Sequence, residues 1–175
     1  MAFISFPGWQ PGMVMTADRL ESSSLPGRLV FRATRDTSQS IPDTTSANPD
    51  SANVFSWESV EVDDLGGFSG GSPTRYTCML DGWYRIDAKA AFNANVAGGV
   101  RTLGVFETGV LVPSGHFRNA KTPTNFVDTV TGFVSLLLSA GDYVQMAPGQ
   151  NTGGALLTAT GGTRPSIEIS FNRHV

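Results

Sequence analysis

Hydrophobic and polar residues alternate with a period of two in several stretches of the chain. In the stretch 84–90, Tyr, Ile and two Ala occupy every second position, and Arg85, Asp87 and Lys89 lie between them. The stretch 167–171 alternates in the same way, with apolar residues at its first, third and fifth positions. Because successive side chains of a strand point to opposite faces, this pattern predicts strands with one buried and one solvated face.

Short apolar runs bounded by glycine and proline predict the other strands. The chain of 175 residues contains 20 glycines and 10 prolines, which leaves little room for long helices. Further strands are expected at 29–33, 54–62, 76–80, 100–106, 110–112, 130–138, 143–146 and 155–160. The pattern therefore predicts an all-β fold of eight to ten strands, a ten-stranded jelly-roll sandwich.

Residues 1–27 have a different pattern and precede the predicted domain at 28–175. Thr16 can cap a short helix, and the Ser- and Pro-Gly-containing stretch 22–27 predicts a hinge. A segment this short cannot bury its aromatic side chains alone, so it either folds back onto the domain or docks on a partner. We expect a docking arm. Its expected contacts are four apolar side chains: Phe3, Phe6, Trp9 and Leu20.

The charge composition limits the classes of partner. Twelve basic and 15 acidic residues give a net charge of −3, which argues against binding to nucleic acid through phosphate neutralisation. No apolar run approaches the roughly 20 residues of a membrane span, so no membrane partner is expected. Only 15% of the residues are charged, so the surface either faces other protein or is covered by neutral polar side chains.

The sequence offers little material for catalysis or for a metal centre. The stretch Gly67–Gly71 matches Gly-x-Ser-x-Gly, but that motif needs a following helix and a nearby histidine, and a loop is predicted here. Cys78 is the one cysteine and is expected to be a small buried hydrophobe. We expect no catalytic residue, no cofactor and no metal ligand. Asp63 and Asp64 are either solvated loop residues or ligands of a calcium ion.

Four segments resemble the C1q/tumour necrosis factor superfamily, in the same order and at similar spacing. They are Arg32–Arg35, Arg75–Ile86, Leu136–Val144 and Ser166–Phe171. Two of them contain an Asp beside a Gly, at Asp81-Gly82 and Gly141-Asp142, where tight turns are expected. The resemblance covers most of 28–175. The sequence departs from the family at 107–109, where animal members have a Gly-Asn pair.

This resemblance implies a homotrimer around a threefold axis, with one sheet of each protomer facing its neighbours. The low charge and the aromatic residues suit such a contact. Three aromatic side chains are the candidates for the trimer interface: Phe106, Phe133 and Tyr143. Trp83 and Trp57 serve either as core anchors or as interface residues, and Trp83 is expected in the core.

The arm adds a second resemblance. Trp9, the Pro-Gly pair that follows it and the stretch 16–20, placed before a C1q-like domain, resemble minor tail and other virion proteins of tailed phages with actinobacterial hosts. This implies a non-enzymatic virion protein, made in the host cytoplasm and exposed on the virion surface. Its arm would anchor a trimeric head to other virion proteins, and the head would serve host-surface attachment.

Two alternatives remain open beside the tail protein: a capsid decoration or head-fibre protein with the same fold, and a glycan-degrading enzyme. The loops at 98–99, 116–124 and 150–154 offer an outer surface either for host cell-wall glycan or for neighbouring virion subunits. The candidate binding residues there are His116, Arg118 and Lys121.

Overall fold

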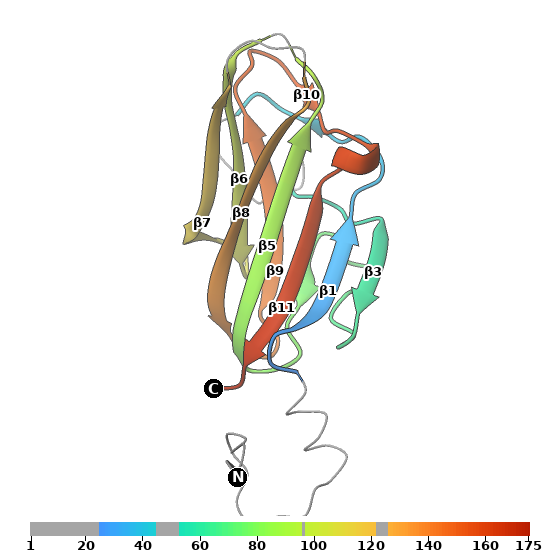
Figure 1. The fold of residues 1–175 in the computed structure, drawn as a ribbon, viewed down its shortest axis with the longest axis vertical. Coiled ribbons are helices and arrows are strands. Elements are labelled where there is room, and N and C mark those ends of the chain that lie inside the picture. Colours follow the sequence, from blue (N-terminus) through green and yellow to red (C-terminus); the bar gives the residue numbers. More distant parts are fainter. Residues whose placement is uncertain (1–24, 45–52, 96, 122–125) are drawn as a thin grey trace, which may run out of the picture.

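Two antiparallel β-sheets stack face to face in the computed structural model, which describes residues 25–44, 53–95, 97–121 and 126–175 (Figure 1). The first sheet has five strands, in the order β3 (Ser59–Asp63), β1 (Arg28–Thr34), β11 (Ser166–Arg173), β5 (Gly82–Phe92) and β8 (Asp128–Leu138). The second has four strands, in the order β4 (Tyr76–Thr77), β9 (Tyr143–Gln150), β6 (Gly99–Glu107) and β7 (Val110–Lys121). The all-β jelly roll is therefore confirmed.

Two short elements complete the fold. Strand β10 (Leu156–Leu157) pairs with β2 (Ser40–Ile41), and Gly161–Thr163 forms a single 3-10 turn before β11. Within the described ranges, no helix is long and apolar enough to cross a membrane.

Several strands differ in length from the predictions: those expected at 76–80 and 155–160 shrink to β4 and β10, and the one expected at 143–146 extends as β9 to Gln150. Two further differences affect the candidate residues. The expected strand at 54–62 forms a ladder only from Ser59 onward, although Phe55 and Trp57 are buried as the alternation predicts. The expected strand at 110–112 extends to Lys121 as β7, so His116 lies on a strand and not in a loop. Strand β7 follows β6 through a two-residue turn at Thr108 and Gly109, both with positive φ, and this hairpin holds the polar half of β7 in register.

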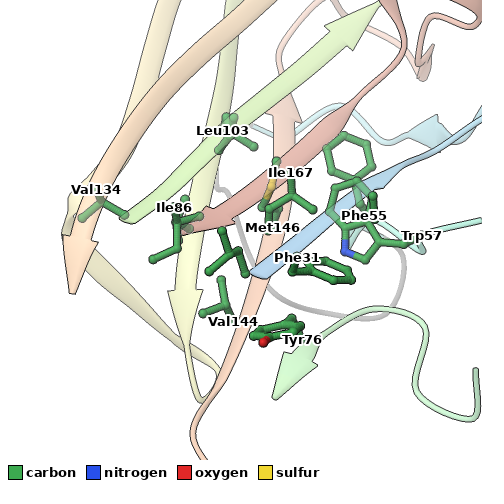
Figure 2. Close-up of a cluster of buried hydrophobic side chains, with 14 of the residues drawn as sticks. Phe31, Phe55, Trp57, Tyr76, Ile86, Leu103, Val134, Val144, Met146 and Ile167 are labelled. Atoms are coloured by element: carbon green, nitrogen blue, oxygen red, sulfur yellow. The ribbon is translucent and has the colours of Figure 1, made fainter. Parts of the chain in front are cut away.

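The core lies between the two sheets. Strands β1, β5, β8 and β11 contribute apolar side chains from one layer, and β6 and β9 contribute them from the other (Figure 2). Aromatic rings fill the part of the core near β4: Phe31 stacks on Tyr76 with ring centroids 4.7 Å apart, and Tyr84 meets Phe171 edge-on at 5.1 Å. Burial of these side chains removes a large apolar area from water and drives the stacking of the two sheets.

The expected tight turn forms at Gly141-Asp142, but at Asp81-Gly82 the chain only bends, because β4 and β5 belong to different sheets and form no hairpin. Each of the two glycines is required for its own reason. Gly141 has φ of 98°, a conformation that favours glycine. Gly82 is required because a Cβ there would lie 2.5 Å from the carbonyl oxygen of Arg173. Asp81 accepts a hydrogen bond from the N–H of Ala140 at 2.7 Å, and Asp142 accepts one from Ser139 at 2.8 Å. The hydrogen bond of Asp81 thus ties the bend before β5 to the turn between β8 and β9.

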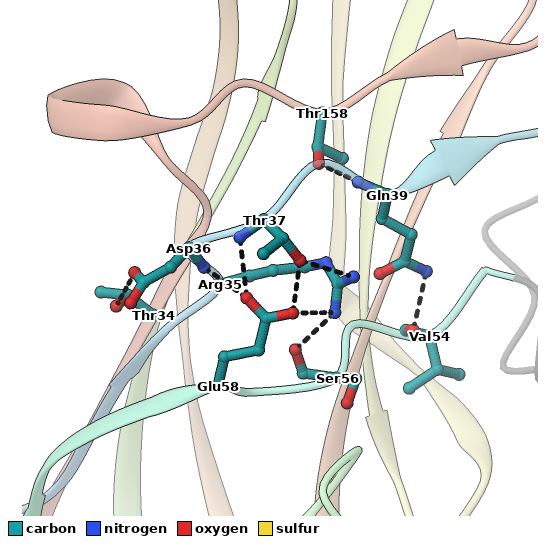
Figure 3. Close-up of polar contacts among 9 residues, drawn as sticks. All are labelled: Thr34, Arg35, Asp36, Thr37, Gln39, Val54, Ser56, Glu58 and Thr158. Atoms are coloured by element: carbon teal, nitrogen blue, oxygen red, sulfur yellow. Dashed lines mark hydrogen bonds and ion pairs between the residues drawn. The ribbon is translucent and has the colours of Figure 1, made fainter.

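A polar clip fastens the end of β1 to the segment that precedes β3 (Figure 3). The Glu58 carboxylate accepts hydrogen bonds from the backbone N–H groups of Asp36 and Thr37, at 2.9 and 2.7 Å, and pairs with Arg35 at 3.3 Å. Arg35 also donates to the carbonyl of Ser56 at 2.9 Å. Burial alone would raise the pKa of Glu58, but the hydrogen bonds from Thr37, the Arg35 charge and the Asp36 N–H together lower it.

Glu58→Gln is therefore expected to lower stability at neutral pH more than in acid. A carboxylate whose pKa is lower in the folded state contributes stability above its unfolded pKa and loses it as pH falls through the folded pKa. Urea unfolding should show a neutral-pH loss on the order of 1 kcal/mol, which shrinks in acid. A loss of the same size at both pH values would contradict this role for the clip.

Candidate functional site

An apolar patch lies exposed on the outer face of the five-stranded sheet, where β5 and β8 pair. It consists of Trp83, Phe133 and Leu137, which we call the β5–β8 face. Trp83 lies directly opposite Leu137 across the ladder, and Phe133 lies four residues before Leu137 on the same side of β8, opposite Asp87. Phe133 is 58% exposed and Leu137 49% exposed, whereas Trp83 is half-buried. Since large apolar side chains grouped on one face are typical of contact sites, this face is the candidate functional surface.

Charged side chains hold the aromatic rings of this face in place. The Arg85 guanidinium lies 4.3 Å from the centre of the Phe133 ring and donates to both carboxylate oxygens of Asp87, at 2.8 and 2.9 Å. These hydrogen bonds and the Asp87 charge raise the pKa of Arg85. Arg173 lies over the Trp83 ring at 5.6 Å. Rings ordered in this way lose less conformational freedom when a partner covers them.

The other half of the same sheet face is charged. Arg32 pairs with Glu168 at 2.9 Å and with Glu61 at 3.7 Å, and Arg164 pairs with Asp36 at 3.3 Å. An open depression between these groups is lined by residues of β1, β3 and β11 together with Lys89. The sheet therefore presents two unlike surfaces side by side. Such a face suits head-to-tail contacts in a closed ring, in which each copy uses different patches toward its two neighbours.

Only one of the three sequence-predicted interface candidates lies on this face. Phe133 does, but Phe106 is 2% exposed within the single chain, because it packs with Val54 and Ala147 on the four-stranded sheet. Its ring is therefore not available to a neighbouring protomer. Tyr143 is half-buried on β9 of the same sheet, with the Arg75 guanidinium 4.8 Å from its ring centre.

Sequence reasoning missed Leu137 and favoured the wrong one of two alternatives for Trp83. The expectation that Trp83 is a core residue is wrong, since the side chain points outward from β5 while its neighbour Tyr84 points into the core. The period of two already contained this information, because an inward Tyr84 places Trp83 on the opposite face. Trp57, by contrast, is buried in the core.

The outer-loop candidates are brought together on a strand and not in a loop. His116 and Arg118 are exposed on β7 and line a groove whose far wall is β8. Lys121 is the last residue of β7, and its side chain lies outside the described part of the structure. The four arm residues Phe3, Phe6, Trp9 and Leu20 also lie outside the described residues.

The side chains considered for metal binding and catalysis have structural partners. Asp63 accepts hydrogen bonds from the N–H groups of Gly67 and Phe68, at 2.9 and 3.2 Å, and Asp64 pairs with Arg28 at 2.8 Å. No group of three or more metal-ligating side chains occurs among the described residues. The segment 67–71 is followed by turns, as its loop assignment predicted. Burial raises the pKa of Cys78 to about 12, which keeps this buried thiol protonated.

Comparison with known proteins places the fold. A scan against protein-family models and a search of curated proteins found no match for the sequence. Among solved structures, the globular domain of the zebrafish complement 1qA protein is similar with a TM-score of 0.55 and 15% identity, over 85% of this chain and all of that one. Eiger TNF from S. frugiperda is similar with a TM-score of 0.56 and 9% identity, over 84% of this chain and 94% of that one. The chain thus has the jelly-roll fold that these C1q and TNF structures share.

Proposed function

We propose that this protein is a non-enzymatic structural protein that assembles as a homotrimer through the β5–β8 face. The observation that carries this proposal is the apolar group formed by exposed Phe133 and Leu137 with half-buried Trp83, in which Arg85 and Arg173 order the two rings. Covering this patch would remove apolar area from water at each of three equivalent contacts. The neighbouring charged half of the sheet supplies polar groups for the rim of the contact.

The number of protomers is proposed from the shared fold. The resemblance to the C1q/tumour necrosis factor superfamily implies threefold assembly, in which one sheet of each protomer faces its neighbours. The five-stranded sheet fits that role, because its outer face carries the exposed Phe133 ring and the Leu137 side chain. On the outer face of the four-stranded sheet, Val54 of the same chain already packs over Phe106, so this ring is not free for a neighbouring protomer.

We further propose that the trimer is a virion protein of a tailed phage, located on the virion surface and used for host attachment. The arm at 1–27 would anchor the head to other virion proteins, as its resemblance to minor tail proteins implies. A capsid decoration protein with the same trimeric head is the second candidate. Binding of the purified protein to host cells would favour attachment, and binding to capsids that lack the protein would favour decoration.

Removal of the arm separates folding from anchoring. The truncation should end at residue 24, because Leu25 packs against the core and the N–H of Gly27 donates to the carbonyl of Phe171 at 2.6 Å. The chain that begins at Leu25 is expected to fold and to form trimers, but to be missing from purified phage particles. Full-length protein with Leu157→Asp, a change of an exposed residue outside both proposed contacts, is the control and should be incorporated. Normal incorporation of the truncated chain would contradict the anchoring role.

A further inference from the structure

A polar groove runs along the seam where the two sheets meet at their edges. Strand β7 is the edge of the four-stranded sheet and β8 is the edge of the five-stranded sheet, and the two lie side by side (Figure 1). The groove between them is lined by residues of both strands: His116, Phe117, Arg118, Asn119, Thr129, Val130 and Thr131.

Two contacts across the seam fix the shape of this groove. The Phe117 ring lies against the backbone of Gly132, where a Cβ would be 2.2 Å from the ring, so only glycine allows this approach. Further along the seam, the Asn119 amide donates to Asp128 at 3.1 Å. The walls are therefore held at a set separation before any ligand arrives, which favours binding because little freedom is lost.

The chemistry of the lining is cationic and rich in hydrogen-bonding groups. Arg118 is exposed, and within the described ranges its guanidinium forms neither an ion pair nor a hydrogen bond. No lining residue is a carboxylate. The adjacent Asp128 carboxylate accepts a hydrogen bond from the Asn119 amide and lies 3.9 Å from the buried Arg101 guanidinium. The positive charge of Arg101 therefore partly balances the negative charge of Asp128. The groove thus presents positive charge on a chain whose net charge is −3.

We propose that the β7–β8 groove binds a negatively charged saccharide, one that carries carboxylate or phosphate groups. The planar guanidinium of Arg118 can bind either group through two parallel hydrogen bonds. The Asn119 amide and the Thr129 and Thr131 hydroxyls donate and accept hydrogen bonds, as sugar hydroxyls require. The half-buried Phe117 side chain supplies an apolar surface for the C–H groups of a sugar ring. The choice of a saccharide as ligand rests on the proposed role in host attachment.

The test measures binding of the full-length protein by titration calorimetry to three soluble probes. These are an oligogalacturonate, a glycerol phosphate oligomer and, as the neutral comparison, a maltodextrin of similar length. We expect at least one anionic probe to bind and the maltodextrin not to bind. Which of the two anionic probes binds distinguishes recognition of carboxylate from recognition of phosphate. Equal binding of the maltodextrin, or no binding of either anionic probe, would overturn the proposal.

Variants then locate the site. Arg118→Gln should weaken binding at least about tenfold, as expected for loss of a charge-assisted pair. Thr131→Val, which keeps the shape and removes a hydroxyl, should weaken it by a smaller factor. Arg28→Gln is the matched control, because it removes the same charge at a position outside the groove, where Arg28 pairs with Asp64. Equal affinity of Arg118→Gln and Arg28→Gln would overturn the location.

Light scattering on the same samples separates this inference from the proposed assembly. A trimer that binds neither anionic probe would overturn the groove proposal alone. A monomer that binds an anionic probe through Arg118 would overturn the assembly and support the groove.

Discussion

Leu137→Asp is expected to convert the trimer into monomers without unfolding the chain. The Leu137 side chain is 49% exposed and points away from the core, so a carboxylate there stays hydrated in the monomer. In the trimer, the same carboxylate would be buried against apolar side chains at all three contacts. The lost apolar contact and the desolvated charge together cost roughly 3 kcal/mol or more at each contact. This lowers the association constant of each contact more than about 100-fold. Size-exclusion chromatography with light scattering measures the result.

Leu157→Asp provides the matched control for this experiment. Leu157 is 47% exposed, almost the same as Leu137, but it lies on β10 and outside the β5–β8 face. It should remain a trimer. If Leu137→Asp stays trimeric, or if both variants dissociate alike, the β5–β8 face is not the assembly surface.

Phe171→Ala is expected to lower the free energy of unfolding by about 3–5 kcal/mol. The ring is fully buried on β11, the middle strand of the five-stranded sheet, and it packs against Tyr84 and over Gly82. Truncation removes its contacts and leaves a cavity that surrounding strands cannot fill, because the ladders on both sides fix their positions. The measurement is urea unfolding.

The stability comparison needs a monomeric background and a neighbouring control. Unfolding of an oligomer depends on protein concentration, so both variants are made in the Leu137→Asp chain, provided that it is monomeric. Ser170→Ala changes the adjacent residue of β11, which points to the outer face, and should lower stability by less than about 1 kcal/mol. A loss of that small size for Phe171→Ala would contradict the central place of its ring in the core.

The parts of the fold that the sequence predicts are those set by local pattern. The stretches 84–90 and 167–171 alternate as β5 and β11 do, because each strand has one face on the core. The turn at Gly141-Asp142 was predictable because Gly141 has a positive φ, which favours glycine. The need for glycine at position 82 was also predictable, but it comes from the close approach of the Arg173 backbone and not from a hairpin turn.

The parts that were missed depend on contacts distant in sequence. Phe106 points away from the sandwich core, since its neighbour Val105 points into it, yet Val54 covers it from a segment some fifty residues earlier. No local sequence pattern predicts this contact between Val54 and Phe106. Strand β7 was predicted too short because its polar half does not alternate and is held by pairing with β6.

The candidate surface was only partly predictable for the same reason. Phe133 was identified from its aromatic character. The contact of its ring with Arg85, which Asp87 holds in place, joins β5 to β8. This contact cannot be predicted without the register of the β5–β8 ladder. The groove beside β7 likewise required the approach of Phe117 to Gly132, which joins the two sheets.

Sedimentation equilibrium of the unaltered chain at micromolar concentration tests the central claim most directly. Assembly through Trp83, Phe133 and Leu137 predicts one species with three times the chain mass, unchanged as the protein is diluted within that range. A species with the mass of a single chain would contradict it.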